Sequence, residues 1–227
     1  MNIAIVLSGG TGSRMGMDTP KQYLKVCDKP VIKYSMDTIL GCENIDAVHV
    51  VADASWHELI KDCVEAGYMD KFKGFSVPGE NRQLSIYNAL RDISEYADEK
   101  DRVIVHDAAR PFLKEQTLVD LISALDDFDG AIPVLPMKDT VYLSKDGQID
   151  SLLERSAVVA GQAPESFLFG KYMAANEALL PDKIKRINGS TEPAYLYGMS
   201  IKCIPGDEGN YKITTIDDLK RWQGEGV

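Results

Sequence analysis

The chain has 227 residues, 44% of them hydrophobic and 26% charged, which is the composition of a folded globular protein and excludes the disordered and fibrous classes. Its 25 Lys and Arg against 35 Asp and Glu give a formal net charge of -10. This charge opposes binding to nucleic acid and to anionic lipid, because both are polyanions that attract Lys and Arg. The four cysteines form no C-x-x-C pair, and the apolar run at residues 3–7 is too short for a signal or membrane segment. We therefore expect a cytoplasmic protein with no nucleic-acid or membrane partner.

The first predicted element is a buried strand. Residues 3–7 form a continuous apolar run that ends at Ser8-Gly9-Gly10, which is typical of a strand covered on both faces of a parallel sheet. Further strand-like runs follow at residues 47–52, 103–105, 131–135 and 201–204. Helical patterns lie between and after them, at residues 31–40, 56–66, 84–96, 116–125, 167–180 and 216–222. Such alternation indicates βαβ crossovers, so we expect an α/β fold with a doubly wound, mostly parallel, Rossmann-like sheet.

Residues 138–160 interrupt this alternation. Two short strand-like runs flank Lys145-Asp146-Gly147, and Asp-Gly between such runs is a strong hairpin signal. We expect a β-hairpin that projects from the sheet. Residues 188–193 are the stretch richest in turn formers and are predicted to be a loop. Since no repeat or linker divides the chain, we expect one domain over residues 1–227, with a β-arm at about 138–160.

A glycine-rich segment, LSGGTGSRMG at residues 7–16, follows the first strand. Glycines allow backbone N–H groups to approach a phosphate chain closely, and Arg14 and Lys21 supply positive charge. The glycines alone would more often mark a tight turn between a strand and a helix, but the two nearby cations favour a triphosphate site. The spacing misses the G-x-G-x-x-G dinucleotide motif by one residue and contains no P-loop motif, so a dinucleotide site is disfavoured and a P-loop is excluded.

Three further segments carry charged residues near predicted element ends. In HDAARP, at residues 106–111, Asp107 follows a strand and is placed to hold Mg²⁺ against phosphates, with Arg110 nearby, although an Asp there is also a common turn cap. His106 is interpreted as structural. In residues 79–90, Arg82 and Ser85 open a helix and either contact a nucleotide or are simply solvated. Lys212 lies just ahead of the last helix.

The order of these motifs is more specific than any one of them. The series of residues 9–16, 20–24, 82–90, 106–111, 139–140, 162–164 and 210–215 resembles the cytidylyltransferases that act on 2-C-methyl-D-erythritol 4-phosphate and on ribitol 5-phosphate. The resemblance covers nearly the whole chain and implies a nucleotide-diphospho-sugar transferase-like fold. It implies a Mg²⁺-assisted reaction of CTP with a polyol phosphate, giving a CDP-polyol and pyrophosphate. It also implies a homodimer whose subunits exchange the β-arm.

The resemblance also assigns the site residues. The nucleotide cradle would be formed by Leu7, Ser8, Gly9, Gly10, Thr11 and Gly12. Cytosine and ribose would be read by Gly79, Arg82 and Ser85. The catalytic cations would be Arg14, Lys21 and Lys212, and the metal ligand would be Asp107. The acceptor would be bound by Arg110, Thr140 and Arg155, the last two acting in the partner's site.

Departures from the family pattern concern the acceptor. Methylerythritol-phosphate enzymes typically read Gln-Thr-Pro-Gln where this chain reads Gln162-Ala163-Pro164-Glu165, and a Thr-Asp-Asp-Ala-like segment is replaced by residues 188–193. In the family, the residue before the Asn of the last motif is commonly acidic. In this chain that residue is Gly209, and Glu208, one residue earlier, is the candidate for a second metal ligand. Since a site that loses hydrogen bonds to one substrate discriminates against it, the acceptor half is expected to differ. The product would then be a CDP-alditol for a cell-surface polymer, or an isoprenoid precursor if methylerythritol phosphate is retained.

Three other functions remain open at this stage. A nucleotidyltransferase that joins another NTP to a sugar 1-phosphate would use the same glycine-rich segment and cations. A catalytically silent nucleotide-binding paralogue would fit Ala163, Glu165 and Gly209. A dinucleotide-dependent oxidoreductase is disfavoured by the missing fingerprint.

Overall fold

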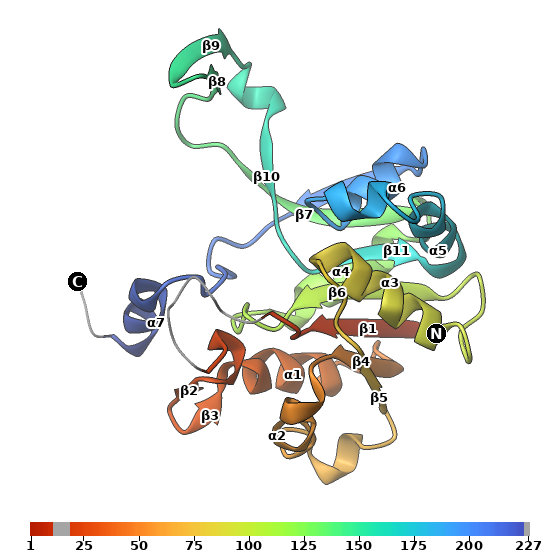
Figure 1. Cartoon of the computed structure of the whole chain (residues 1–227). Coiled ribbons are helices and arrows are strands. Elements are labelled where there is room, and N and C mark those ends of the chain that lie inside the picture. The colour runs from red at the N-terminus through yellow and green to blue at the C-terminus, as the bar shows by residue number, and fades with distance from the viewer. Residues whose placement is uncertain (11–18, 225–227) are drawn as a thin grey trace.

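The computed structural model describes residues 1–10 and 19–224 of the chain. An eight-stranded sheet runs in the order β10-β7-β11-β6-β1-β4-β5, with β12 beside β7 (Figure 1). The strands are β1 Asn2–Leu7, β4 Ala47–Val51, β5 Phe72–Ser76, β6 Arg102–Asp107, β7 Gly130–Pro136, β10 Val159–Gly161, β11 Glu165–Leu168 and β12 Ile201–Pro205. Strands β6, β1, β4 and β5 pair in parallel. The mostly parallel α/β sheet expected from the alternation is therefore confirmed, with β11 inserted antiparallel between β6 and β7.

Helices cover both faces of the sheet. They are α1 Val31–Gly41, α2 His57–Lys61, α3 Arg82–Ile93, α4 Glu115–Ala124, α5 Phe169–Glu177, α6 Thr191–Leu196 and α7 Ile216–Gln223. One core joins Ala4 and Val6 to α1, α2 and α4, and the other joins Ile3 and Ile5 to α3, α5 and α6. Alternate residues of β1 thus point into two separate cores, which is why this strand is apolar at every position from Ile3 to Leu7. In the part of the chain that the structure describes, no helix combines the length and apolarity needed to cross a membrane.

Several predicted boundaries are wrong, and tertiary pairing explains most of them. The helix predicted to start at residue 167 begins at Phe169, because Phe167 pairs with β6 and β7 as part of β11. The predicted loop at 188–193 contains the start of α6. The helix predicted over residues 56–66 is reduced to α2, and beyond it the carbonyl of Cys63 accepts a hydrogen bond from Lys33 in α1. Strand β5 was not predicted, since its five residues include Lys73 and Gly74.

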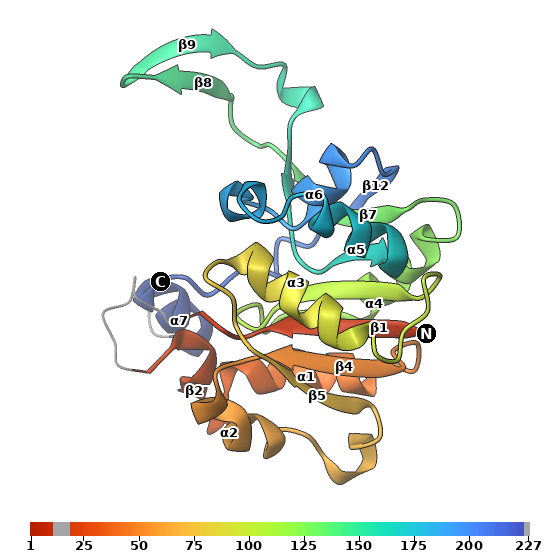
Figure 2. The ribbon, with the colours of Figure 1, turned by 45° about the vertical axis from the view of Figure 1, so that its right-hand side comes forward.

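The predicted hairpin is present as β8 (Tyr142–Lys145) and β9 (Gln148–Leu152). Asp146 and Gly147 both have positive φ, as an Asp-Gly hairpin turn requires. The hairpin extends well away from the sheet in both views (Figures 1 and 2), and every residue of its two strands is exposed.

The carboxyl ends of the parallel strands meet at one edge of the sheet. Leu7, the last residue of β1, lies directly opposite Asp107, the last residue of β6. The glycine-rich segment and the HDAARP segment therefore leave the sheet side by side. Ligands of open α/β sheets bind beyond this edge, so the fold brings two predicted site segments to the expected place.

Candidate active site

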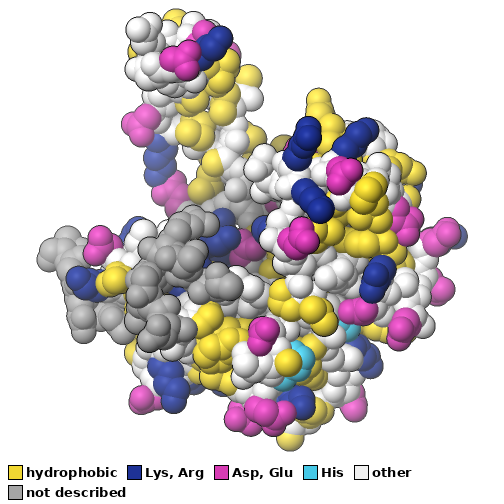
Figure 3. All heavy atoms as spheres, in the orientation of Figure 1, with side chains coloured by type: hydrophobic (Ala, Val, Ile, Leu, Met, Phe, Trp, Pro, Cys, Tyr) yellow, Lys and Arg dark blue, Asp and Glu magenta, His cyan; other side chains and the backbone are white. Residues whose placement is uncertain are grey.

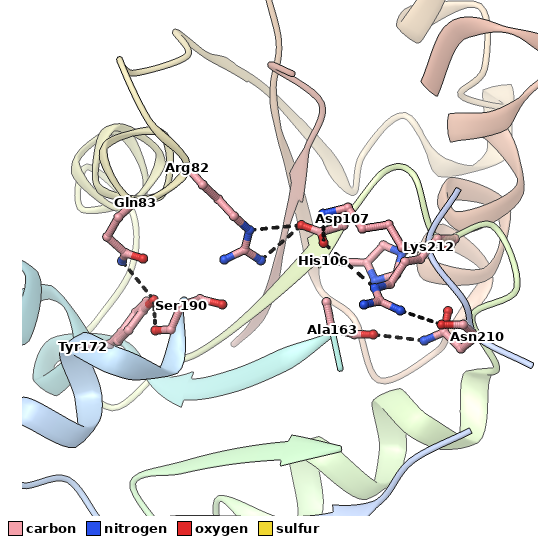
Figure 4. Close-up of polar contacts among 10 residues, drawn as sticks. Arg82, Gln83, His106, Asp107, Ala163, Tyr172, Ser190, Asn210 and Lys212 are labelled. Carbon is pink, nitrogen blue, oxygen red and sulfur yellow. Dashed lines mark hydrogen bonds and ion pairs between the residues drawn. The ribbon is translucent and has the colours of Figure 1, made fainter. Parts of the chain in front are cut away.

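Asp107 is the centre of a charged cluster at the end of β6, and its side chain is buried with only 8% of the residue exposed. Arg82, at the start of α3, donates to Oδ1 from Nε and Nη2 at 3.2 and 3.1 Å. Lys212 donates from Nζ to Oδ2 at 2.8 Å, and the Nε atom of Arg110 lies 3.9 Å from the same oxygen. Figure 4 shows Arg82 and Lys212 approaching Asp107 from opposite sides.

These cations determine the ionisation state of Asp107. Burial by itself would raise the pKa of Asp107, but Arg82 and Lys212 outweigh it and hold the pKa well below its usual range. Asp107 is therefore an anion at every physiological pH. Because three positive side chains surround this one carboxylate, the cluster keeps an excess of positive charge, and charges held in place by the fold stabilise a bound polyanion without reorganising.

Lys212 is held in place by its neighbours in the chain. Ile213 is fully buried and its N–H donates to the carbonyl of Ala109 at 2.8 Å. The Asn210 side chain donates to the carbonyl of Ala163 at 2.9 Å, and the Asn210 carbonyl accepts from Arg110 at 2.7 Å (Figure 4). The segment is thus fixed on both sides of Lys212. Sequence reasoning assigned no role to Asn210, whose buried amide is the anchor.

The described part of the glycine-rich segment, residues 7–10, is fixed by two side chains from the next turn. Gln22 donates from Nε2 to the carbonyls of Ser8 and Gly10, each at 2.8 Å, and the Tyr23 hydroxyl donates to the Ser8 carbonyl at 2.9 Å. A side chain at Gly9 would approach Pro78 to 2.7 Å, so only glycine fits there. The predicted residues Thr11, Gly12 and Arg14 lie outside the described residues. Lys21 belongs to the same 3-10 turn as Gln22 and Tyr23.

The predicted base-reading segment is a tightly bonded turn. The Ser85 hydroxyl accepts from the Gly79 N–H at 2.9 Å and donates to the Asn81 carbonyl at 2.9 Å. A Cβ at Gly79 would lie 2.4 Å from the Cβ of Leu84, so this glycine permits the close approach. Ser85 is therefore bonded within the turn, and Arg82 points to Asp107. Their predicted contacts with ribose and cytosine remain predictions.

Two predicted acceptor residues are not brought to the Asp107 cluster of their own chain. Thr140 and Arg155 are exposed and flank the hairpin, where Arg155 donates from Nη1 to the Lys138 carbonyl at 3.1 Å. Their predicted role in a partner's site stays a prediction. The carboxylate of Glu208 pairs with Lys138 at 2.6 Å, and its role as a second metal ligand also stays a prediction.

His106 fits the structural role expected for it. The residue is fully buried, and its Nε2 atom lies 3.1 Å from the carbonyl of Arg110. Burial lowers the pKa of His106 to about 4, so the ring is neutral. A neutral ring that bonds to the backbone in this way orients the turn that carries Arg110.

The residues present fit a magnesium ion held mainly by substrate. Among the described residues no group of three or more His, Cys, Asp or Glu could hold a metal, so a metal ion here would have few protein ligands, and Asp107 is the one predicted from the sequence. Mg²⁺ commonly uses one or two carboxylates and completes its shell with water and substrate phosphates. Both Asp107 oxygens accept hydrogen bonds from cationic side chains. Metal binding therefore requires at least one of these two side chains to move to another anion.

Glu165 is a site feature that sequence reasoning left without a role. Only 8% of the residue is exposed, and its Oε2 atom has no hydrogen-bond partner. Burial raises the pKa of Glu165 to about 7 even though Arg82 and Arg110 oppose this shift. The signal in the sequence was an acidic residue two positions after Ala163, next to the apolar residues of what the structure shows to be a buried strand.

The raised pKa predicts how Glu165 affects stability. Because the folded protein holds the proton more tightly than the unfolded chain, stability is lost as the pH rises from about 4.5 through about 7. Glu165→Gln stays neutral, so it should stabilise the protein at pH 8 by up to about 3 kcal/mol, with the gain vanishing near pH 5. Urea unfolding at both pH values, with exposed Asp150→Asn as the control, measures this. Equal stability of Glu165→Gln and wild type at pH 8 would contradict it.

Comparison with known proteins agrees with this geometry. The family model described as IspD, 2-C-methyl-D-erythritol 4-phosphate cytidylyltransferase, matches residues 2–224. The ribitol-5-phosphate cytidylyltransferase of Streptococcus agalactiae serotype III is 30% identical, over 96% of this chain and 92% of that protein. The 2-C-methyl-D-erythritol 4-phosphate cytidylyltransferase of Clostridium perfringens strain SM101 is 29% identical, over 96% and 95%. The solved 4-diphosphocytidyl-2C-methyl-D-erythritol synthase of Anaerococcus prevotii shares the fold, with a TM-score of 0.84, 24% identity and coverage of 98% and 94%. The resemblance drawn from the order of the motifs is confirmed, and the chain belongs to the IspD family of cytidylyltransferases.

Proposed function

We propose that the protein transfers the cytidylyl group of CTP to the phosphate of an acyclic polyol phosphate. The observation that carries the proposal is the buried Asp107 cluster, which gathers Arg82, Arg110 and Lys212 beside the glycine turn at the end of β1. An excess of fixed positive charge next to a backbone cradle suits a reaction between two polyanions.

The proposed chemistry is an in-line displacement. An oxygen of the acceptor phosphate attacks the α-phosphorus of CTP and forms a new P–O bond. The bond from the α-phosphorus to the oxygen bridging to the β-phosphate breaks, and pyrophosphate leaves with the electron pair. Lys212 and Arg110 neutralise the negative charge that the two substrates bring together, and Lys21 and Arg14 are assigned the same task.

Magnesium enters the proposal through Asp107. When bound, Mg²⁺ neutralises phosphate charge and polarises the α-phosphate, and Asp107 is the residue that would hold it. Lys212 bonds to Asp107 in the structure, and a bound triphosphate would give it another anion to bond. Asp107 therefore keeps Lys212 in position before nucleotide arrives.

For the acceptor we propose a pentitol phosphate such as ribitol 5-phosphate. Ala163 lacks the hydroxyl found at this position in the Gln-Thr-Pro-Gln pattern, and Glu165 adds a buried acid. Both changes alter the acceptor side of the cluster. Relatives named for ribitol 5-phosphate and for 2-C-methyl-D-erythritol 4-phosphate are 30% and 29% identical to this chain, so the choice rests on these two residues. The use of CTP and four free cysteines fit a cytoplasmic enzyme that makes a CDP-alditol for a cell-surface polymer.

The proposal is tested by pyrophosphate release. We expect the fastest turnover with CTP among the four NTPs, and a higher kcat/KM with D-ribitol 5-phosphate than with 2-C-methyl-D-erythritol 4-phosphate. Lys21→Ala, as the control for contaminating activity, should lower kcat by about 100-fold, the loss expected from one stabilising group.

Three outcomes would count against parts of this account. Faster turnover with UTP or GTP and a sugar 1-phosphate would reject cytidylyl transfer. A wide preference for methylerythritol phosphate would reject the pentitol. CTP binding without pyrophosphate release from any acceptor would indicate a silent paralogue.

We further propose that the β-arm makes the protein a homodimer. An isolated two-stranded hairpin is only marginally stable in water. This hairpin also carries exposed large apolar side chains, and yellow spheres are visible on the arm in Figure 3. They are Tyr142, Leu143, Ile149 and Leu152, each at least 46% exposed. Covering these side chains by a second copy would stabilise both arms.

Sedimentation velocity tests the dimer. Wild type should sediment as a dimer at micromolar concentration, and Ile149→Asp with Leu152→Asp should sediment as a monomer because two charges would be buried at the contact. Exposed Lys145→Asp on the same hairpin is the control for a change of charge and should remain dimeric. A monomeric wild type would exclude the arm as a dimer contact.

A further inference from the structure

A pocket of about 450 Å³ lies next to the Asp107 cluster and shares Arg110 and Lys212 with it. Its wall follows the end of β7 and the strand that returns from the arm, and Leu135, Met137 and Tyr211 make part of it apolar. This volume is within the usual range for small-molecule sites. The pocket is therefore continuous with the proposed reaction centre and large enough for a second substrate.

Two oppositely charged side chains also line this pocket and are absent from the Asp107 cluster. Lys138 follows the end of β7, and its ammonium group lies 2.6 Å from the Glu208 carboxylate. The Lys138 carbonyl accepts a hydrogen bond from Arg155, which ties the outgoing strand of the arm to the returning chain. The Lys138 backbone is thus fixed, while its side chain remains 71% exposed.

The Lys138–Glu208 pair is available to a ligand. The side chains are 71% and 61% exposed, and ion pairs between exposed side chains contribute little to stability, so a ligand can insert into this pair at low cost. Lysine only donates hydrogen bonds and a carboxylate only accepts them. A hydroxyl group does both, so neighbouring hydroxyls of a polyol match a donor and an acceptor placed side by side.

The charged side chains of the pocket fall into two sets. Arg110 and Lys212 are the cations shared with the Asp107 cluster, whereas Lys138 is balanced by Glu208. A phosphate is attracted to Arg110 and Lys212, because three cations there share one carboxylate. A neutral hydroxylated chain suits the balanced Lys138–Glu208 pair. We propose that this pocket receives the acceptor, with its phosphate at Arg110 and Lys212 and its hydroxyl groups at Lys138 and Glu208, which makes this pair a specificity determinant for an acyclic polyol. The proposal rests on the proposed cytidylyl transfer and adds the residues that recognise the acceptor chain.

The test separates recognition of the polyol chain from recognition of its phosphate. Lys138→Met should raise the KM for D-ribitol 5-phosphate about tenfold, the effect of losing one charge-assisted hydrogen bond, with kcat and the KM for CTP within twofold. Glycerol 3-phosphate, which is two carbons shorter, should bind both proteins equally as substrate or competitive inhibitor. Glu208→Leu should behave like Lys138→Met, and Glu208→Gln, which keeps an acceptor oxygen, should largely restore the KM.

Lys145→Met, in the exposed hairpin, is the matched control for a lost lysine and should leave every constant unchanged. An unchanged KM for D-ribitol 5-phosphate in Lys138→Met would overturn the proposal, as would an equal loss for glycerol 3-phosphate.

Failure of the transfer reaction itself is distinguished by calorimetry. If wild type releases no pyrophosphate with CTP and D-ribitol 5-phosphate, the proposed function fails, and direct binding of D-ribitol 5-phosphate decides the role of the pocket. Tenfold weaker binding to Lys138→Met supports that role. Equal binding to both proteins, or none to wild type, rejects it.

Discussion

The site depends on one buried carboxylate. Asp107 ends β6 opposite the glycine turn of β1 and bonds to Arg82 from α3 and to Lys212 from the segment before α7. Without this anion, the positive side chains would repel one another at the buried edge of the sheet, where removing one partner of a charge pair is strongly destabilising. The fold thus assembles three cations in advance, around a group that offsets their mutual repulsion and holds them in place.

Glu165 lowers the stability of the same region at neutral pH. A buried acid with an unpartnered oxygen is costly, and at neutral pH the raised pKa of Glu165 means that ionisation works against folding. Its Oε2 atom has no hydrogen-bond partner in the described chain, and the charges of Arg82 and Arg110 offset the cost of burial only in part. Such an acid beside Arg82 and Arg110 fits a region shaped by ligand binding, where local rules of stability are commonly broken. Lys138 and Glu208 line the pocket that shares Arg110 and Lys212 with this cluster.

Sequence patterns predicted the parts of the fold that depend on local periodicity. The apolar run of β1 and the Asp-Gly turn of the hairpin were recognisable because their signals lie in neighbouring residues. Strand β11 was not, since its pairing between β6 and β7 is decided by distant segments. For the site, order along the chain predicted Asp107, Arg110 and Lys212, which the structure places together, but it could not show that Arg82 bonds to Asp107 or that Glu208 pairs with Lys138. The net charge of -10 likewise says little about this cluster, because charges interact over only about 8 Å at physiological salt.

Asp107→Asn tests the central claim most directly, since it removes the anion and keeps the shape of the side chain. With CTP present, Mn²⁺ binding followed by electron paramagnetic resonance should be lost or weakened at least tenfold. The kcat for pyrophosphate release should fall by roughly 100-fold or more, while CTP still binds because the cations remain. A variant that stays folded, binds Mn²⁺ like wild type and turns over at a similar rate would contradict the account.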